Sequence, residues 1–445
     1  MFNKILRRLE GREYLKKVIG NISWLTIEKI FQSILGLFII AWVARYLGPE
    51  NFGIMNYAIA YVALFATFSR LGLTGIVVRN IVNHPSNKEK YLGSAFILKV
   101  FGSFLVIILS LLSIFIVEPG NNQMALFVFI ISLGVLFRSF DVIEYWFQSQ
   151  VKSKYTAFSR SFSFGIVSMI KVLLILSNAP LVWFVMTYLI ENAISAIFLI
   201  IYYIRKEKTS IFNWEIKVVT VKNLLKDSWP LILSGVAVAL YMRIDQVMIG
   251  SMLDSTQLGI YSAAVMLSES WYFIPGIIAG SVFPAILEAK KKSERLYLNR
   301  LQMLYTFFTW FTIPIALLIT ILSPYIINTL YGSEYSAAAT VLSIHIWAGV
   351  FVFLGSASGK YLIAENHTKV AFYRTLLGLL VNIILNIILI PVYGIVGAAI
   401  STLVSYCFAA YISNSIFKKT RIIFIMQTKS FNLLRFLSGN NEKNN

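Results

Sequence analysis

Twelve apolar stretches, each long enough to cross a lipid bilayer, alternate along the chain with short polar connections. A hydrocarbon core of about 30 Å needs roughly 20 apolar residues per helix. The spans are expected near residues 18–44, 53–73, 92–117, 123–145, 157–177, 180–204, 228–250, 259–285, 301–323, 337–363, 370–390 and 394–417. The pattern predicts an all-α integral membrane protein. No connection is long enough for a soluble catalytic domain, so we expect no enzyme activity.

Basic residues are distributed unevenly between the two sides of this predicted bundle. Of the 39 Lys and Arg residues, 32 lie at the two chain ends and in the even-to-odd connections, whereas the opposite connections hold only Arg45. The positive-inside rule places the basic side in the cytoplasm. Both termini are therefore expected to be cytoplasmic. The net charge of +19 reflects topology and does not indicate nucleic-acid binding.

Two sequence matches indicate an internal repeat. LGPENFGIMNYA (47–58), between spans 1 and 2, matches LDSTQLGIYSAA (253–264), between spans 7 and 8, at an offset of 206 residues. KYTAFSR (154–160) matches TKVAFYR (368–374) at an offset of 214 residues. Because both matches join equivalent spans, they predict two six-helix lobes in the same orientation with a site near the midplane between them.

The expected organisation follows from these spans. It comprises a cytoplasmic amphipathic segment at 1–17, an N-terminal lobe at 18–204, a cytoplasmic interlobe linker at 205–227, a C-terminal lobe at 228–417 and a cytoplasmic basic tail at 418–445. The tail alternates basic and apolar residues, which suits an interfacial helix on an anionic leaflet. A merely solvated tail is an equally good interpretation.

Three basic residues near the ends of predicted spans, Arg160, Lys360 and Arg374, are assigned to the even-to-odd cytoplasmic connections. Six others fall inside the spans, where an unpaired charge facing lipid costs roughly 2.5 to 3.5 kcal/mol. Arg70 and Lys99 lie near the inner interface, so their long side chains are expected to reach water. The other four are candidates for binding an anionic substrate: Lys29, Arg138, Lys171 and Arg243. Of these, Arg138 has a ready ion-pair partner in Asp141, three residues further on.

Acidic side chains also lie deep in the spans. The candidates for ion coupling are Glu28, Glu191, Asp245 and Glu269. Arg243 and Asp245 are two residues apart, so they project to different sides of one helix and do not simply cancel. Structural ion pairs between the lobes are an equal alternative to substrate binding for these charges. The three His residues form no metal constellation, and no phosphate-binding loop is present, so neither a metal nor another cofactor is expected.

Residues that break or join helices complete the pattern. Gly48-Pro49 and Pro391 with Gly394 are expected to break helices at the outer face. Asn382 and Asn386 lie one turn apart on one face of span 11, where a hydrogen bond between helices is the expected role of their amides.

Four stretches resemble the polysaccharide-exporter family, the Wzx-type O-antigen flippases of the superfamily that also holds MATE drug exporters and lipid II flippases. They are ARYLGPENFGIMNYA (44–58), MRIDQVMIG (242–250), VFPAI (282–286) and NIILNIILIPVYGIVGAAIST (382–402). The resemblance implies a MATE-like fold and alternating access in the bacterial plasma membrane. Its implied cargo is an undecaprenyl-pyrophosphate-linked oligosaccharide, the repeat unit of O-antigen or another surface polysaccharide, carried from the inner to the outer leaflet. A coupling proton or sodium ion, and glycosyltransferase and polymerase partners, are implied with it.

Charge chemistry bears on the alternatives within this superfamily. Arginine suits a pyrophosphate because its planar fork donates two parallel hydrogen bonds, whereas lysine acts as a point charge. A MATE-type drug or cation antiporter would need an anionic, aromatic cavity, and the deep Lys and Arg residues count against it. A lipid II flippase is the second alternative.

The first prediction tests the orientation. In a Cys407→Ser background, Ser255→Cys and Ser333→Cys should react with an impermeant thiol reagent added to intact cells, because both positions lie in odd-to-even connections. Ser293→Cys, in an even-to-odd connection, should stay unlabelled. Labelling of Ser293→Cys from outside would reverse the topology.

Overall fold

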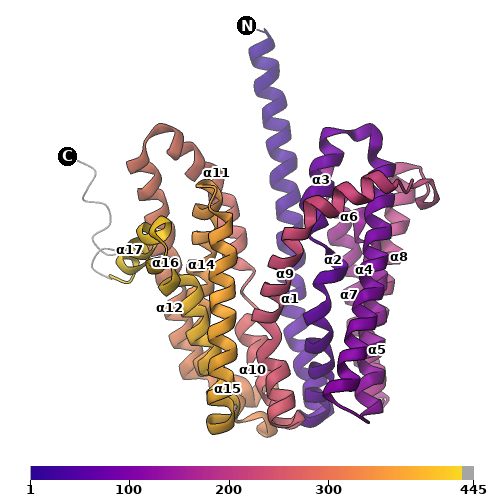
Figure 1. Ribbon diagram of the computed structural model, residues 1–445, viewed down its shortest axis with the longest axis vertical. Coiled ribbons are helices and arrows are strands. Elements are labelled where there is room, and N and C mark those ends of the chain that lie inside the picture. Colours follow the sequence, from indigo (N-terminus) through magenta and orange to yellow (C-terminus); the bar gives the residue numbers. More distant parts are fainter. Residues whose placement is uncertain (1, 433–445) are drawn as a thin grey trace. The chain divides into compact units, whose positions relative to one another are not determined.

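A computed structural model describes the backbone of residues 2–432, and the side chains of this range except those of residues 2–19, 21, 22, 25 and 368. This part of the chain is helical and contains no β-strand (Figure 1). The helices in the first half are α1 (Phe2–Phe65), α2 (Thr67–Arg70), α3 (Leu73–Asn83), η1 (Pro85–Asn87), α4 (Lys88–Val117), α5 (Asn122–Phe137), η2 (Arg138–Asp141), α6 (Val142–Ser149), α7 (Lys154–Leu176), α8 (Leu181–Glu207), η3 (Ile211–Asn213) and α9 (Val218–Met252). Those in the second half are α10 (Ser255–Glu269), α11 (Ile274–Lys292), α12 (Glu294–Leu330), η4 (Ser333–Tyr335), α13 (Ala338–His345), α14 (Ala348–Ala364), α15 (Thr368–Cys407), η5 (Phe408–Ile412), α16 (Ser413–Ile416), η6 (Lys418–Thr420) and α17 (Arg421–Ser430).

Ten helical segments of the described chain are long and apolar enough to cross a membrane. They correspond to the twelve predicted spans, because the first segment, Thr26–Phe65, and the last, Lys369–Ile416, each contain two. Both are interrupted at a glycine, Gly48 with φ 73° and Gly394 with φ 57°. A positive φ is strained for residues with a side chain, so glycine allows the break. The predictions of an all-helical, multi-pass membrane protein and of helix breaks at these two motifs are confirmed.

Close backbone contact marks the second of these breaks. A Cβ atom on Gly397 would lie 2.2 Å from the carbonyl oxygen of Leu389, on the other side of the break at Gly394. Deeper in the hairpin, the Asn382 amide donates to the hydroxyls of Thr402 at 3.5 Å and Ser405 at 3.4 Å. The Asn386 amide in turn donates to Asn382 at 3.0 Å. The predicted interhelical role is therefore confirmed for Asn382, whereas Asn386 bonds within its own helix and supports Asn382.

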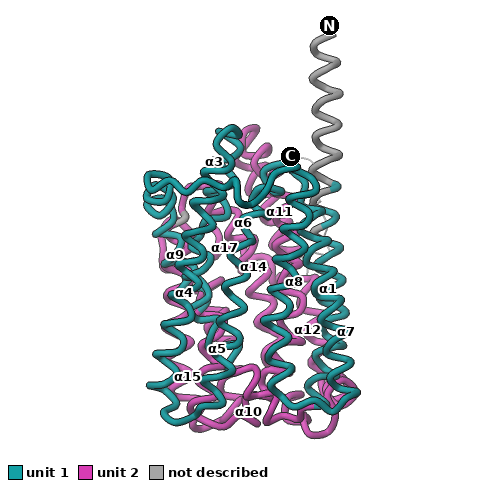
Figure 2. The backbone as a smooth tube through the Cα atoms, turned by 90° about the vertical axis from the view of Figure 1, so that its right-hand side faces the viewer, with its two compact units in different colours: residues 1–46, 58–239 teal, residues 47–57, 240–445 magenta. Residues whose placement is uncertain are grey.

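Contacts divide the chain into two compact units (Figure 2). Unit 1 comprises residues 1–46 and 58–239, and unit 2 comprises residues 47–57 and 240–445. Helix α9 therefore begins in unit 1 and ends in unit 2. The boundaries of the predicted lobes, 18–204 and 228–417, remain a prediction, because compact units defined by contacts do not test a sequence repeat.

Unit 2 includes a reciprocal crossing between the two halves of the sequence repeat. A Cβ atom on Gly53 would lie 1.7 Å from the carbonyl oxygen of Ser255, and one on Gly259 would lie 1.9 Å from that of Pro49. The same offset of 206 residues relates Gly53 to Gly259 and Pro49 to Ser255. Small residues permit this backbone approach. The side chain of Asp254 caps α10 at the crossing by accepting from the Gln257 amide at 2.8 Å.

Three sequence interpretations need correction. Arg160 and Arg374 were assigned to cytoplasmic loops, but they lie within α7 and α15. Arg374 is buried and donates to the carbonyl oxygens of Ala409 and Ala410 in the π-helical segment η5. A π-helix leaves carbonyl groups out of the regular ladder, and a guanidinium is well suited to satisfy them.

The third correction concerns the C-terminal tail. The solvated interpretation is wrong for residues 421–430, because α17 buries Ile423 and Met426 in the core of unit 2. Gln427 is buried and donates to the Ser358 hydroxyl and to the Ala410 carbonyl, both at 3.0 Å. Residues 433–445, and the side chains of the predicted amphipathic segment at 1–17, lie outside the described residues.

The second prediction tests the glycine crossing. Gly53→Ala should lower the free energy of unfolding by about 1 to 3 kcal/mol, because the new methyl group meets a backbone atom that cannot rotate away. Gly280→Ala is the matched control, since a Cβ there has no atom within 4 Å. Thermal unfolding in detergent compares the two. Equal melting temperatures of the two variants would mean that the helices at Gly53 move apart without any loss of stability.

Candidate functional site

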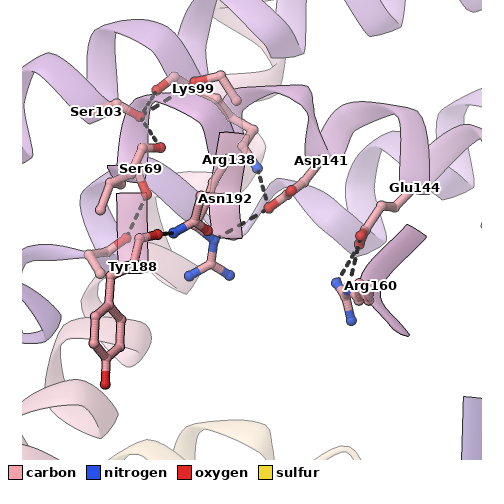
Figure 3. A network of polar contacts seen from close by, with 12 residues as sticks. Ser69, Lys99, Ser103, Arg138, Asp141, Glu144, Arg160, Tyr188 and Asn192 are labelled. Atoms are coloured by element: carbon pink, nitrogen blue, oxygen red, sulfur yellow. Dashed lines mark hydrogen bonds and ion pairs between the residues drawn. The ribbon is translucent and has the colours of Figure 1, made fainter. Parts of the chain in front are cut away.

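Unit 1 contains a cluster of charged side chains within its membrane-spanning helices (Figure 3). The α-helix α5 ends at Phe137, and the tighter turn of η2 follows inside the same membrane-spanning segment. Short 3₁₀ stretches within a longer helix often mark functional positions. This turn presents Arg138 and Asp141, which are predicted to form a pair.

Asp141 interacts with two cations. Its Oδ2 atom is 3.6 Å from Arg138 Nε, which confirms the predicted pair, and 3.5 Å from Lys99 Nζ. The Lys99 side chain is only 2% exposed, whereas that of Arg138 is 37% exposed. The expectation that Lys99 snorkels to water is therefore wrong: packing of α4 against η2 gives this buried ammonium a counter-charge instead. In Figure 3 the outer nitrogens of Arg138 point away from Asp141.

A second pair lies beside the first. Arg160 donates through Nε and Nη2 to the two carboxylate oxygens of Glu144, at 2.9 and 2.6 Å. This two-point geometry is the strongest form of an arginine–carboxylate contact. The candidate Glu28 is buried in α1 and interacts electrostatically with Arg160 and with its neighbour Lys29, which is exposed. Sequence reasoning missed this pair because Arg160 was placed in a loop.

Two more predicted residues meet between α7 and α8. Lys171 Nζ lies 5.2 Å from the ring centroid of Tyr188, within the range of a cation–π contact. Glu191, one turn beyond Tyr188, interacts electrostatically with Lys171. The candidate cation and the candidate carboxylate are thus neighbours in unit 1.

Unit 2 contains the remaining candidates. Arg243 Nη1 is 3.7 Å from Glu269 Oε2, and both side chains are partly exposed. Asp245 is buried and accepts from the Tyr261 hydroxyl at 2.5 Å and the Thr402 hydroxyl at 3.4 Å. The expectation that Arg243 and Asp245 do not simply cancel is confirmed, because each has partners of its own.

The oxygen partners of Asp245 were not identified from the sequence. Tyr261 belongs to the repeat match at 253–264, and Thr402 belongs to the stretch at 382–402 that carries the family resemblance. Their separation from Asp245, 16 and 157 residues, gives no local signal. Among the described residues, no group of three or more His, Cys, Asp or Glu side chains suits a metal ion.

The two units differ in the balance of charge inside their spans. Among the charged residues of unit 1 described above, five cations accompany four carboxylates: Lys29, Lys99, Arg138, Arg160 and Lys171, and Glu28, Asp141, Glu144 and Glu191. In unit 2 the charged residues described above are Arg243 and Arg374 with Asp245 and Glu269.

Many membrane spans with charged pairs among them are typical of a multi-pass membrane transporter. The family described as "Polysaccharide biosynthesis protein" matches residues 18–290, and the family described as "MatE" matches residues 230–388. Because the first match covers more than half of the chain, this protein belongs to the polysaccharide biosynthesis protein family.

Individual proteins agree with this assignment. The chain is 23% identical to the capsular polysaccharide biosynthesis protein CapF of Staphylococcus aureus, over 90% of this chain and 99% of that protein. It is 24% identical to a putative O-antigen transporter of Shigella flexneri, over 86% and 94% of the two chains. A structure of the lipid II flippase MurJ in an inward closed conformation matches with a TM-score of 0.71 at 20% identity, over 94% and 93% of the chains. That likeness, shared with solved MATE transporters, confirms the predicted MATE-like fold.

The third prediction tests whether Asp141 neutralises Lys99. Asp141→Asn should destabilise unit 1 by about 3 kcal/mol, because it leaves a buried ammonium without its counter-charge. The double variant Asp141→Asn with Lys99→Met should regain part of this loss. Asp227→Asn, which breaks a pair between two half-exposed side chains, is the control and should change stability by less than about 1 kcal/mol. Thermal unfolding measures all three, and an unchanged Asp141→Asn variant would exclude the neutralising role.

Proposed function

We propose that this protein is a flippase that moves an undecaprenyl-pyrophosphate-linked oligosaccharide from the inner to the outer leaflet of the bacterial plasma membrane by alternating access. The observation that carries the proposal is Asp141, one carboxylate shared by Lys99 and Arg138. Because Lys99 is the buried partner, Arg138 keeps a partly exposed guanidinium with positive charge to offer. The names of the relatives, one for capsular polysaccharide biosynthesis and one for O-antigen transport, support the same cargo class.

Charge matching supports a diphosphate as the group that is recognised. A pyrophosphate diester carries about two negative charges, and among the charged residues of unit 1 described above the cations outnumber the carboxylates, five to four. Arginine can donate two hydrogen bonds to neighbouring phosphate oxygens. Arg138 is therefore the first candidate for this contact, with Lys29 and Lys171 as point charges.

Arg243 is a further candidate for contact with the diphosphate of the cargo. Its contact with Glu269 is 3.7 Å, longer than a good hydrogen bond, and both groups are partly exposed. Such a pair exchanges its partner more easily than the two-point pair of Arg160 with Glu144. Arg243 can thus leave Glu269 for a phosphate group, which frees a carboxylate for a cation.

The deep carboxylates suit a coupling ion. Asp245 has the Tyr261 and Thr402 hydroxyls around it, and Asn382 reaches Thr402. Oxygen ligands of this kind suit a sodium ion, and the carboxylate alone suits a proton. Glu269, Glu28 and Glu191 are the further candidates for coupling.

The proposed orientation supplies part of the driving force. With both termini in the cytoplasm, a cargo of about two negative charges leaves a cell whose interior is negative. At 100 mV this transfer gains about 4 to 5 kcal/mol. Export therefore has a source of energy even before an ion gradient is added. Glycosyltransferases and a polymerase are the proposed neighbours on the two sides of the membrane.

Two related functions compete with this proposal. A MATE-type cation antiporter shares the fold, but the excess of positive charge in unit 1 would repel an organic cation. A lipid II flippase carries the same lipid diphosphate with a different saccharide, and the fold similarity to MurJ is compatible with it. The first alternative differs in charge and the second in the sugar, so cargo assays separate them.

The fourth prediction tests the cargo and the role of Arg138 together. Purified protein in liposomes should flip a fluorescent undecaprenyl-diphosphate oligosaccharide, measured as protection from a membrane-impermeant reagent. Arg138→Gln should lower the initial rate about 10- to 100-fold, since a charge-assisted hydrogen bond contributes about 1.5 to 3 kcal/mol. Arg138→Lys should retain part of the rate.

The control for Arg138→Gln is Lys292→Gln, which removes a positive charge from an exposed pair with Glu288 and should leave the flipping rate unchanged. The substrate proposal is wrong if the protein moves an organic cation and no lipid diphosphate. A preference for lipid II over other saccharides would favour the lipid II alternative. If Arg138→Gln flips the lipid diphosphate at the normal rate, Arg138 does not belong to the binding site, but the proposed cargo still stands.

A further inference from the structure

An exposed set of apolar and basic side chains covers the connection from α8 to α9 in unit 1. Phe212 is 91% exposed, Val219 is 72% exposed and Trp229 is 56% exposed. Exposed cations alternate with these apolar residues along the segment: Arg205, Lys206, Lys208, Lys217, Lys222 and Lys226. Two of the three carboxylates here, Glu207 and Asp227, pair with cations outside the segment, Lys88 and Arg79.

This connection is fixed to unit 1 and is not a loose linker. The Trp214 indole donates to the Tyr203 hydroxyl at 3.1 Å, and the Glu215 amide donates to the Glu89 carbonyl at 3.2 Å. A Cβ atom on Gly93 would lie 2.5 Å from the Glu215 carbonyl oxygen, so the connection packs directly on the backbone of α4. The exposed side chains are therefore held in place by their own buried neighbours.

The first turns of α9 continue the same surface. Leu224 is buried in the core of unit 1, and Arg79 holds Asp227 at 2.9 Å. In Figure 1 these turns run across the ends of the neighbouring unit 1 helices. Pro230 lies inside α9, close to the start of the predicted span at residue 228. Residues 205–229 thus lie at the ends of predicted membrane spans of unit 1.

We propose that residues 205–229 form a docking surface for anionic phospholipid head groups, which we call the linker platform. Apolar side chains of a surface-lying segment enter the boundary between head groups and acyl chains, and tryptophan favours that depth. Lysines beside them attract anionic lipids. The occupant is lipid because the platform adjoins the point at which α9 enters the spans, where phospholipids are its neighbours, and because its positive charge complements their phosphates. The platform does not depend on which cargo is transported.

The fifth prediction measures the depth of the platform directly. The full-length protein, with Cys407→Ser and a spin label on Val219→Cys, is reconstituted in phosphatidylcholine or in a 7:3 mixture with phosphatidylglycerol. Relaxation by oxygen and by a water-soluble nickel complex reports how deeply the label lies. We expect the nickel accessibility to fall at least twofold in the anionic mixture. High salt should reverse much of this change, because it screens the lysines.

The difference in nickel accessibility between the two membranes should disappear in a triple variant with Lys208→Gln, Lys222→Gln and Lys226→Gln. The matched control removes three exposed lysines from unit 2 and should keep this difference; its substitutions are Lys291→Gln, Lys292→Gln and Lys419→Gln. All six lysines are exposed, so both variants should fold, as thermal unfolding checks. The proposal is overturned if the label on Val219→Cys is equally accessible in both membranes, or if the lysine substitutions leave the difference intact. The readout needs no transport, so it stands apart from the flippase assay.

Discussion

Contact between two backbones at Gly53 and Gly259 constrains how the chain is divided. Residues 47–57 are joined at both ends to unit 1, yet this contact with α10 places them in unit 2. The contact exists because neither glycine has a side chain, and its reciprocity follows from the sequence repeat. A single methyl group would separate the two backbones. The crossing thus determines where the chain leaves one unit and enters the other.

Charges inside the spans impose the second constraint. An ion transferred from water to a membrane interior needs a partner, so each charged side chain limits which helices can pack together. Lys99 requires α4 to lie against η2, and Arg160 requires α7 to lie against α6. The pairs differ in how much of the cation is exposed. Lys99 is buried beside Asp141, whereas Arg138 and Arg243 are partly exposed, so in the proposed flippase the fold can depend on Lys99 while the two arginines contact the cargo.

Local signals in the sequence were sufficient for the spans, the helix breaks and one ion pair. Hydropathy placed the spans, glycine with proline placed the breaks, and a spacing of three residues paired Arg138 with Asp141. Contacts between distant segments were not predictable in this way. Lys99 meets Asp141 across 42 residues, which depends on helix packing that hydropathy does not encode. Arg160 lies six residues into α7, and a hydropathy profile cannot separate the first turns of a span from the preceding loop.

Sharing of one carboxylate between two cations also bears on release of a cargo. A transporter must bind its cargo well enough to load it and weakly enough to let it go. A lone arginine in a membrane interior would hold a diphosphate too strongly, because nothing would replace the phosphate when it left. Asp141 remains beside Arg138 and gives the guanidinium an alternative partner when the phosphate leaves. Glu269 stands in the same relation to Arg243. In the proposed flippase, the carboxylates that lower the net positive charge of the site are therefore the groups that make turnover possible.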